Sequence, residues 1–454
     1  MTDDRTQQNH LLAAMMAKAG VSNKGLARRV RMLSAGDGGE LVHPDHVAVR
    51  RWLDGVIRQP QPRTCRLIAR ALSEQLGRPV ALADIGYGHL VTTDSDTAIS
   101  YPVGVSDSIN VLCSLVDGQA SNSTFIVVPE AWGSVLVRWF VDSDEPSPPP
   151  TGRRTITDVD IEAAHEATLM FENFDYRFGG GRPKPLVAKY LESEVLPLIR
   201  HSDLGNSVGK RYLSEVALLA RLAGWTAYDT GAHGLAQRYF TQAFRLAKAS
   251  GDRALCGRIL AGMSHQANFL GHYQYAVDLA LAAQRGISNH ATPTAMALFC
   301  AMEARGRASI GDEKGVTAAL LSAERWHARG LPENDPSWVR HFDGAELHAE
   351  FAHCFRDLGL PDLANTHAIA SIRESSKIYV RSLSFCRTVL ATSYLLSNEL
   401  HQALTVAREV IDAAAKLKSS RVRSYLADFQ QRLKPYAGEA QVRNFCEYMV
   451  NVFR

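Results

Sequence analysis

Hydrophobic residues recur at helical spacing along most of the chain. In the first ninety residues these apolar stripes predict four helices, which span roughly 11–19, 22–31, 44–54 and 64–76. In the third of them, Val49 and Trp52 share one face while His46 and Arg50 share another. A helix divided in this way can be buried on one side and can enter a DNA groove with the other.

Residues at the ends of these helices agree with their placement. Ser22 is suited to cap the second helix, Pro44 to stand in the first turn of the third, and Gly55 to end it. A polar, glycine-rich loop over 34–40 separates these two helices. The residues expected in the small core they share are Leu26, Ala27, Val49 and Trp52.

The next stretch mixes helical patterns with polar connectors. Residues 108–116 and 131–141 predict helices, whereas 125–128 are too few to decide between a buried strand and the approach to the next helix. The segment DSDEPSPPPTG over 142–152 is typical of a linker stiffened by prolines. Further helices are expected over 158–174 and 185–200.

The triple glycine at 179–181 between those two helices invites comparison with a phosphate-binding loop. It lacks the spacing and the Lys-Ser/Thr end of a Walker motif, so a bend between helices is the better interpretation.

The remainder of the chain repeats. Each of five copies has a small residue, a turn residue seven positions on, and further small or apolar residues twelve and sixteen positions on. The five starting residues are Gly224, Ser264, Ala304, Ala352 and Ala391; the turns are Gly231, Gly271, Gly311, Gly359 and Asn398. This arrangement resembles tetratricopeptide repeats, in which small residues let two helices of a pair approach closely. The copies are 40, 40, 48 and 39 residues apart, and 330–336 account for the longest gap. HEAT-like repeats have a similar length but would not fix this interval.

These patterns predict a mostly all-α protein with three regions. We expect a helix-turn-helix domain over 1–90, a connector with its proline-rich linker over 91–152, and a repeat domain over 153–454 that ends in a capping helix pair over 422–453. Thirteen Lys and Arg against seven Asp and Glu lie in the first 80 residues, although the whole chain carries only +3. That asymmetry favours a polyanion-binding head on a nearly neutral body.

Composition also argues about compartment and chemistry. The seven cysteines are scattered without a C-x-x-C pair, the N-terminus is polar, and no apolar run is long enough to span a membrane. We therefore expect a cytoplasmic, nucleoid-associated protein that needs no metal or other cofactor. No motif of a known enzyme class is present, since His165-Glu166 is not followed by the rest of a zinc-protease motif. An enzyme is not expected.

The head resembles the phage-repressor type of helix-turn-helix. The resemblance lies in KGLARRV at 24–30, VRRWLDG at 49–55, Pro60, and IARAL at 68–72, with about a dozen extra residues between the two central helices. In that arrangement the second helix lies in the major groove of double-stranded DNA and its early side chains reach the bases. The residues expected to face bases are Asp45, His46, Val47 and Arg50. The residues expected to contact phosphates are Lys24, Arg28, Arg29, Arg51 and Arg58.

Stacked helix pairs form a superhelix whose concave face often binds a peptide or another protein. The positions expected to line this groove, by their place in the repeat, are Arg221, Trp225, Tyr228, Asp229, His265, Asn268, Arg305, Glu346, His353 and Arg356. Such a polar and aromatic lining suits a peptide, small-molecule or protein effector.

Nearly the full chain resembles actinobacterial regulators that join such a head to C-terminal tetratricopeptide repeats. The segments YLESEVLP at 190–197, LAGWTAYDTG at 222–231 and LAQRYF at 235–240 are similar to that group. The resemblance implies a transcriptional regulator, often a repressor of differentiation or antibiotic production. A homodimer is expected, because one small head contacts too few base pairs for selectivity. The alternative is a repeat-based interaction scaffold with a vestigial DNA-binding head.

Overall fold

The computed structural model is all-α in the residues it describes, and it divides into two compact units, 1–97 and 98–454. No strand occurs among the described residues, and none of their helices is both long and apolar enough to cross a membrane. The described residues are 9–36, 42–57, 60, 62–76, 80, 83–87, 99, 101–102, 104–120, 125–141, 154–287, 290–330 and 332–453.

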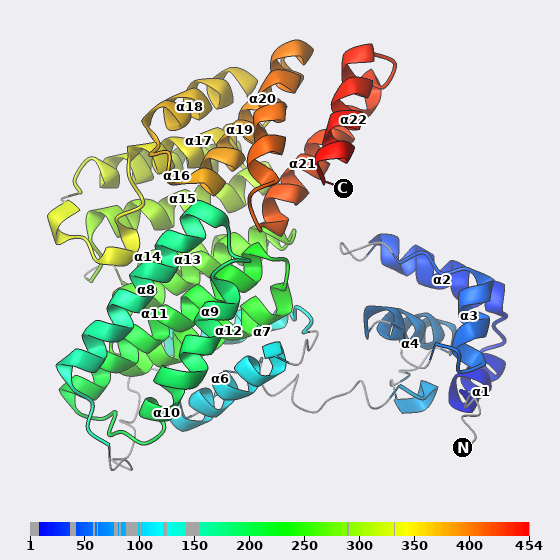
Figure 1. Ribbon diagram of the computed structural model, residues 1–454, viewed down its shortest axis with the longest axis horizontal. Helices are drawn as coiled ribbons and strands as arrows, with labels where there is room; N and C mark the ends of the chain where they lie inside the picture. Colours follow the sequence, from blue (N-terminus) through cyan, green and yellow to red (C-terminus); the bar gives the residue numbers. More distant parts are fainter. Residues whose placement is uncertain are drawn as a thin grey trace. The chain divides into compact units, whose positions relative to one another are not determined.

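The first unit is a small helical bundle (Figure 1). Its elements are α1 (His10–Lys18), α2 (Asn23–Gly36), α3 (His46–Leu53), α4 (Pro62–Leu76) and the short η1 (Ala83–Ile85). The expected core is confirmed, because Leu26, Ala27, Val49 and Trp52 are all at most 5% exposed. Ile68 and Leu72 of α4 complete it from the other side.

The ends of α2 and α3 show what sets these helices. Ser22 Oγ accepts a hydrogen bond from the Gly25 amide at 3.2 Å, as expected of a helix cap. Helix α3 begins at His46, two residues later than predicted: Asp45 caps it and Pro44 lies buried just outside it. Gly55 follows the helix with a φ of +71°, the left-handed conformation that a terminating glycine supplies at little cost.

The predicted loop over 34–40 begins later than expected, because α2 continues to Gly36. Ser34 is buried, and its hydroxyl accepts a hydrogen bond from the Val42 amide at 2.7 Å. This bond fixes the segment that leads into α3 against the end of α2.

In the second unit, the region predicted as a connector holds two packed helices. Helix α6 (Val105–Ala120) lies against α12 (His233–Ser250), and α7 (Glu130–Val141) lies against α14 (Tyr273–Gly286). The segment 125–128 is no strand but the approach to α7. The side chain of Gln237 holds it, accepting from the Val128 amide at 2.9 Å and donating to the Val128 carbonyl at 2.7 Å. The predicted linker over 142–152 lies outside the described residues.

The second unit then continues with α8 (Asp158–Phe178) and α9 (Lys184–Tyr190). A single π turn (Leu191–Val195) and α10 (Leu196–Ile199) follow. The triple glycine is the turn between α8 and α9, and it is held tightly. The Gly180 amide donates to Asp229 at 2.8 Å, and the Gly181 amide donates to the Lys418 carbonyl at 2.9 Å.

Antiparallel helix pairs stack along the rest of the unit as a solenoid-like array (Figure 1). The pairs are α11 (Ser207–Asp229) with α12, α13 (Arg253–Phe269) with α14, α15 (Pro293–Ile310) with α16 (Glu313–His327), α17 (Gly344–Asp357) with α18 (Pro361–Glu374), and α19 (Val380–Leu396) with α20 (Leu400–Ala414). The chain ends with α21 (Ser420–Arg432) and α22 (Ala440–Phe453), at the place predicted for a capping pair. Short 3₁₀ turns occur at η4 (Pro332–Asn334), η5 (Ser337–Val339) and η6 (Lys434–Tyr436).

The repeat interval found in the sequence has a direct structural cause. All five predicted turn residues have positive φ, between +61° and +84°. At Gly224 a Cβ would lie 2.9 Å from the Phe240 ring, so only glycine lets α11 and α12 approach this closely. In the next pair the small Ser264 occupies the same repeat position, and its hydroxyl donates to the Ala276 carbonyl at 2.7 Å. The extra residues of the long interval form η4 and η5.

Helix α8 joins the two ends of this array, because it packs against α11 as well as α19. The inner surface of the stacked pairs is therefore covered by a helix that precedes them in the chain. This cover narrows what the sequence predicted as an open groove into a partly covered cavity.

Candidate functional site

Helix α3 of the first unit presents the predicted base-facing residues on its exposed side. Asp45, His46, Val47 and Arg50 are all exposed, opposite the buried Val49 and Trp52. The Arg50 guanidinium lies 3.5 Å from the Asp54 carboxylate, with side chains 77% and 46% exposed. An ion pair this exposed contributes about 0–1 kcal/mol, so Arg50 is available to another anion.

Asp45 has a structural role besides the predicted one. Its carboxylate accepts a hydrogen bond from the Ala48 amide at 2.7 Å and so caps α3. This bond lowers the pKa of Asp45, since it favours the ionised form.

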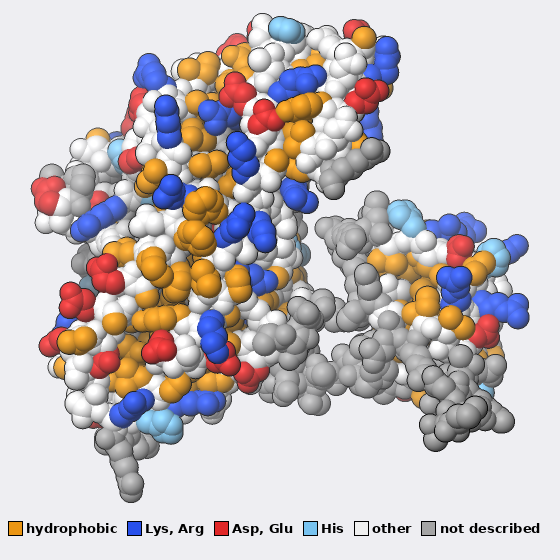
Figure 2. Space-filling model, viewed as in Figure 1, with side chains coloured by type: hydrophobic (Ala, Val, Ile, Leu, Met, Phe, Trp, Pro, Cys, Tyr) orange, Lys and Arg blue, Asp and Glu red, His pale blue; other side chains and the backbone are white. Residues whose placement is uncertain are grey.

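The predicted phosphate-contacting residues cluster beside α3. Lys24, Arg28 and Arg29 are exposed on α2, which packs against α3, and Arg51 is exposed on α3 itself. Lys and Arg side chains gather along this side of the small unit in the space-filling view (Figure 2). Arg58 lies outside the described residues.

The second unit contains a partly covered cavity of about 90 Å³ between α8 and the first helices of the pairs. Six of the ten predicted groove residues line it: Arg221, Trp225, His265, Arg305, Glu346 and His353. Asn268 and Arg356 instead line a neighbouring, larger hollow of about 550 Å³. The two spaces share a wall made of His265, Met302, Arg305 and Tyr425.

Tyr228 and Asp229 do not line either space, which corrects their expected position. Both are fully buried behind the wall. The Tyr228 hydroxyl is hydrogen-bonded to His265 Nδ1 at 2.9 Å, and Asp229 accepts from the Ser419 hydroxyl at 2.9 Å. These two residues position groups of the wall and of α21.

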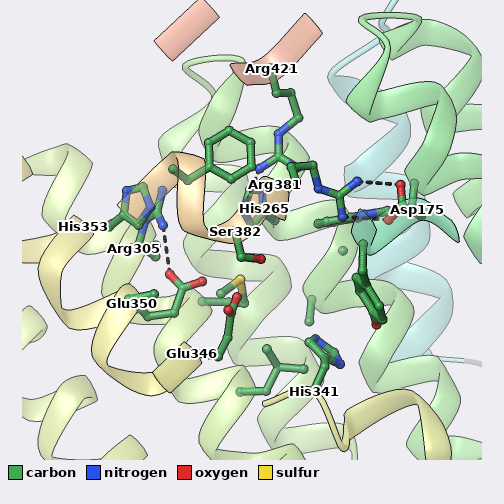
Figure 3. Close-up of a pocket in the computed structure, with 18 of the residues that line it drawn as sticks. Asp175, His265, Arg305, His341, Glu346, Glu350, His353, Arg381, Ser382 and Arg421 are labelled. Atoms are coloured by element: carbon green, nitrogen blue, oxygen red, sulfur yellow. Dashed lines mark hydrogen bonds and ion pairs between the residues drawn. The ribbon is translucent and has the colours of Figure 1, made fainter. Parts of the chain in front are cut away.

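Buried ion pairs hold the cavity walls together (Figure 3). Arg381 donates twice to Asp175, at 2.5 and 2.7 Å, and Arg305 donates to Glu350 at 2.9 Å. Arg221 pairs with Glu172 in the same way, and every one of these side chains is less than 10% exposed. Pairing of this kind is what allows several charges to remain buried.

Arg421 stands in an aromatic cage at one end of the cavity. Its guanidinium carbon lies 4.4 Å from the Tyr228 ring centre, 4.7 Å from that of Phe385 and 5.3 Å from that of Trp225. Its nearest carboxylate is Asp229, at 3.8 Å. Cation–π contacts with these rings therefore stabilise much of the buried positive charge of Arg421.

The pKa values of several titratable groups in the cavity wall differ strongly from their ordinary values. Burial and the neighbouring arginines lower the pKa values of His265, His341 and His353 well below the ordinary value, so these rings are neutral at pH 7. Burial, followed by repulsion from Glu350 and Asp343, raises the pKa of Glu346 to about 8. Burial also lowers the pKa of Arg258 to about 10. Shifts of this size concentrate at functional sites, although structural ion pairs also produce them.

Several wall residues escaped the sequence analysis: Glu172, Asp175, Arg258, His341, Glu350, Arg381 and Arg421. Two of them come from α8, which lies outside the repeats, and His341 and Arg421 also lie outside the repeated helix pairs. Arg258 stands six residues before Ser264, as the predicted Glu346 stands six before Ala352, so its repeat position could have identified it. The spacing of Glu172 and Asp175 beside Phe171 on one helical face is the signal that was available.

Metal binding finds no support in these surroundings. Among the described residues, no three His, Cys, Asp or Glu side chains lie together as metal ligands would. The cavity chemistry is that of guanidinium, carboxyl and imidazole groups.

Comparisons with known proteins concern the first unit. None of the curated proteins compared with the chain matches it. Residues 12–88, from within α1 through η1, match the model of a family described as the SP15 N-terminal domain.

Proposed function

We propose that this protein is a sequence-specific, DNA-binding transcriptional regulator. One observation carries the proposal: the two faces of α3 differ. Asp45 caps the helix, and the buried Val49 and Trp52 anchor it in the core. His46, Val47 and Arg50 stand exposed on the other side. A short helix held in this way can enter the major groove without losing its place in the bundle.

The exposed side chains divide into two roles. Arg50 can donate both arms of its guanidinium to a guanine, which is worth about 1–3 kcal/mol of discrimination. Lys24, Arg28, Arg29 and Arg51 neutralise phosphates and so raise affinity without sequence preference. Asp45 serves the interface chiefly by fixing the first turn of α3.

The repeats would supply regulation. Two heads on a homodimer would contact half-sites one helical turn apart, and the helical repeats would form the dimer, bind an effector, or both. An effector acts only if it binds one arrangement of the heads more tightly than another. By the resemblance to actinobacterial regulators, the expected output is repression of development or secondary metabolism in the cytoplasm, at the nucleoid.

The test begins with selection of genomic DNA fragments by the purified full chain at moderate salt. Affinity for the best fragment is then measured for the wild type, Arg50→Ala, and Arg373→Ala as the matched control, since Arg373 is 75% exposed on α18 of the other unit. Arg50→Ala should weaken the selected site at least tenfold and narrow its advantage over random DNA, while Arg373→Ala should bind as the wild type does.

A contrary result is equally specific. If no fragment is preferred, with or without cell extract, the chain is not a sequence-specific regulator. The alternative of an interaction scaffold with a vestigial head then becomes the better account, and it predicts a protein partner that co-purifies with the chain regardless of DNA.

A further inference from the structure

The cavity wall holds one buried guanidinium that nothing neutralises directly. Arg258 on α13 is 7% exposed, and among the described residues it makes no hydrogen bond or ion pair. Its Nε is buried without a partner. Because a buried charge without a partner is costly, this position is stabilised by an anion placed against it.

Other arginines of the wall have donors to spare. Arg421 has Nε and Nη1 buried without hydrogen-bond partners, and Nε is likewise unpartnered in Arg221 and Arg305. An N–H of a guanidinium can only donate, so each of these groups needs an acceptor. A buried donor that lacks one costs about 1–3 kcal/mol.

The charge balance points in the same direction. Among the described residues, five arginines and four carboxyl groups line the cavity. Three carboxylates are already paired, with Arg221, Arg305 and Arg381. Glu346 is the fourth, and its raised pKa leaves it largely protonated at neutral pH. Asp229, buried behind the wall, lies 3.8 Å from Arg421. Among the described residues, Arg258 is therefore the guanidinium of this wall that no carboxylate pairs, and the wall keeps unused donors.

We propose that this cavity binds a small ligand through an anionic carboxylate or phosphate group, held chiefly by Arg258. Both anions offer the oxygen acceptors that a guanidinium fork contacts in pairs. The proposal gives the chemistry of the effector in the proposed function, and it rests on that part of it. It does not depend on DNA binding.

The volume of the cavity fits an anionic group of a small molecule but not a peptide. About 90 Å³ corresponds to roughly six or more water-sized spheres, enough for a carboxylate or phosphate with a few attached atoms. A larger ligand would place its remainder in the 550 Å³ hollow, across the shared wall of His265, Met302, Arg305 and Tyr425. The labelled charged residues in Figure 3 surround one space, from Arg421 at one end to His341 and Glu346 at the other.

The experiment measures anion binding by the purified full chain without DNA, by titration calorimetry and by the thermal midpoint. The probes are inorganic phosphate and succinate, with chloride at equal ionic strength and neutral succinamide as controls. The variants are Arg258→Gln, Arg258→Lys, which keeps the charge but loses the fork, and Arg373→Gln as a surface control. Circular dichroism of each variant identifies any that fails to fold.

Phosphate, succinate or both should bind the wild type and raise its midpoint, whereas chloride and succinamide should not. The affinity should fall at least tenfold in Arg258→Gln and less in Arg258→Lys, and it should stay unchanged in Arg373→Gln. The ratio of phosphate to succinate affinity distinguishes the two anion classes. If neither probe binds more tightly than chloride, or if Arg258→Gln binds as the wild type does, the proposal is wrong. A chain that binds an anion but no preferred DNA would reject the regulator and retain this site.

Discussion

Arg381 and Asp175 form a two-pronged ion pair although they stand 206 residues apart in the chain. Their side chains are only 5% and 1% exposed, and the pair connects α19 to α8. Removing the Asp175 charge would leave the buried Arg381 with Asp229 alone, at 3.5 Å. Asp175→Asn should therefore lower the free energy of unfolding by about 3 kcal/mol, the lower end of the cost of breaking a buried ion pair. Thermal and denaturant unfolding of the full chain would measure this in the transition of the second unit.

A surface pair gives the comparison for this prediction. Arg432 and Asp428 are 2.7 Å apart but 45% and 55% exposed, so Asp428→Asn should cost about 0–1 kcal/mol. The double variant Asp175→Leu with Arg381→Met should recover part of the loss, because it leaves no unpaired charge. Equal effects of Asp175→Asn and Asp428→Asn would mean that α8 is not held to α19 in this way.

Gly180 marks the place where the turn after α8 touches the end of α11. A Cβ there would lie 2.9 Å from the Asp229 Cβ and 3.0 Å from the Thr226 Cα. Backbone cannot move aside cheaply, so Gly180→Ala should destabilise the second unit by about 1–3 kcal/mol. Gly438→Ala is the control, because nothing lies within 4 Å of a Cβ at that position. Identical midpoints for the two variants would contradict the close approach.

Much of the fold was predictable because it depends on local and periodic features. The twelve-residue interval from Gly224 to Ala236 reports how closely two neighbouring helices pack, and the turn at Gly231 needs a left-handed residue. Both requirements act within one helix pair, so the same small residue and the same kind of turn residue recur in each copy of the repeat. The burial of Val49 and Trp52 followed from helical spacing in the same way.

The covering of the cavity by α8 was not predictable, because periodicity identifies a buried face but not what covers it. The residues around Asp175 in the sequence do not predict that its ion-pair partner lies on α19. Arg421 lies among polar residues in SSRVRS at 419–424, so its sequence context does not indicate burial, yet it is 3% exposed in the structure. Tyr228 and Asp229 were predicted to line the groove for the same reason. In the structure they are buried, where Tyr228 is hydrogen-bonded to His265 and Asp229 to Ser419.

Trp52 and His46 lie on opposite faces of α3, and their replacement should separate stability from recognition. Trp52 is 5% exposed within the core of a small unit. Trp52→Ala should therefore cost about 3–5 kcal/mol, a large part of the stability of such a domain. Its head should lose cooperative unfolding, and DNA binding should disappear at every salt concentration. His46→Ala should unfold as the wild type does. A Trp52→Ala variant that still binds DNA normally would contradict the anchoring of α3.

Glu346 should make the second unit less stable as the pH rises. Its pKa is about 8 in the folded protein against an ordinary value of 4.5. Between these values the unfolded chain releases the proton while the folded chain keeps it, so stability falls as pH increases from about 4.5 to 8. Glu346→Gln removes this loss. Its thermal midpoint relative to the wild type should therefore be higher at pH 8 than at pH 5, by roughly 2–4 °C for each kcal/mol involved.

Comparison at each pH removes the contribution of the neutral histidines. The pKa values of His265, His341 and His353 are lowered, so these rings reduce stability only as the pH falls below about 6.5, where the unfolded chain gains protons. Wild type and Glu346→Gln share that effect, and it cancels in their difference. Glu439→Gln, at an exposed position, should shift the midpoint equally at both pH values. A Glu346→Gln difference that does not grow between pH 5 and pH 8 would mean that the carboxyl ionises in the folded protein as it does in water, and that the cavity is open to solvent on that side.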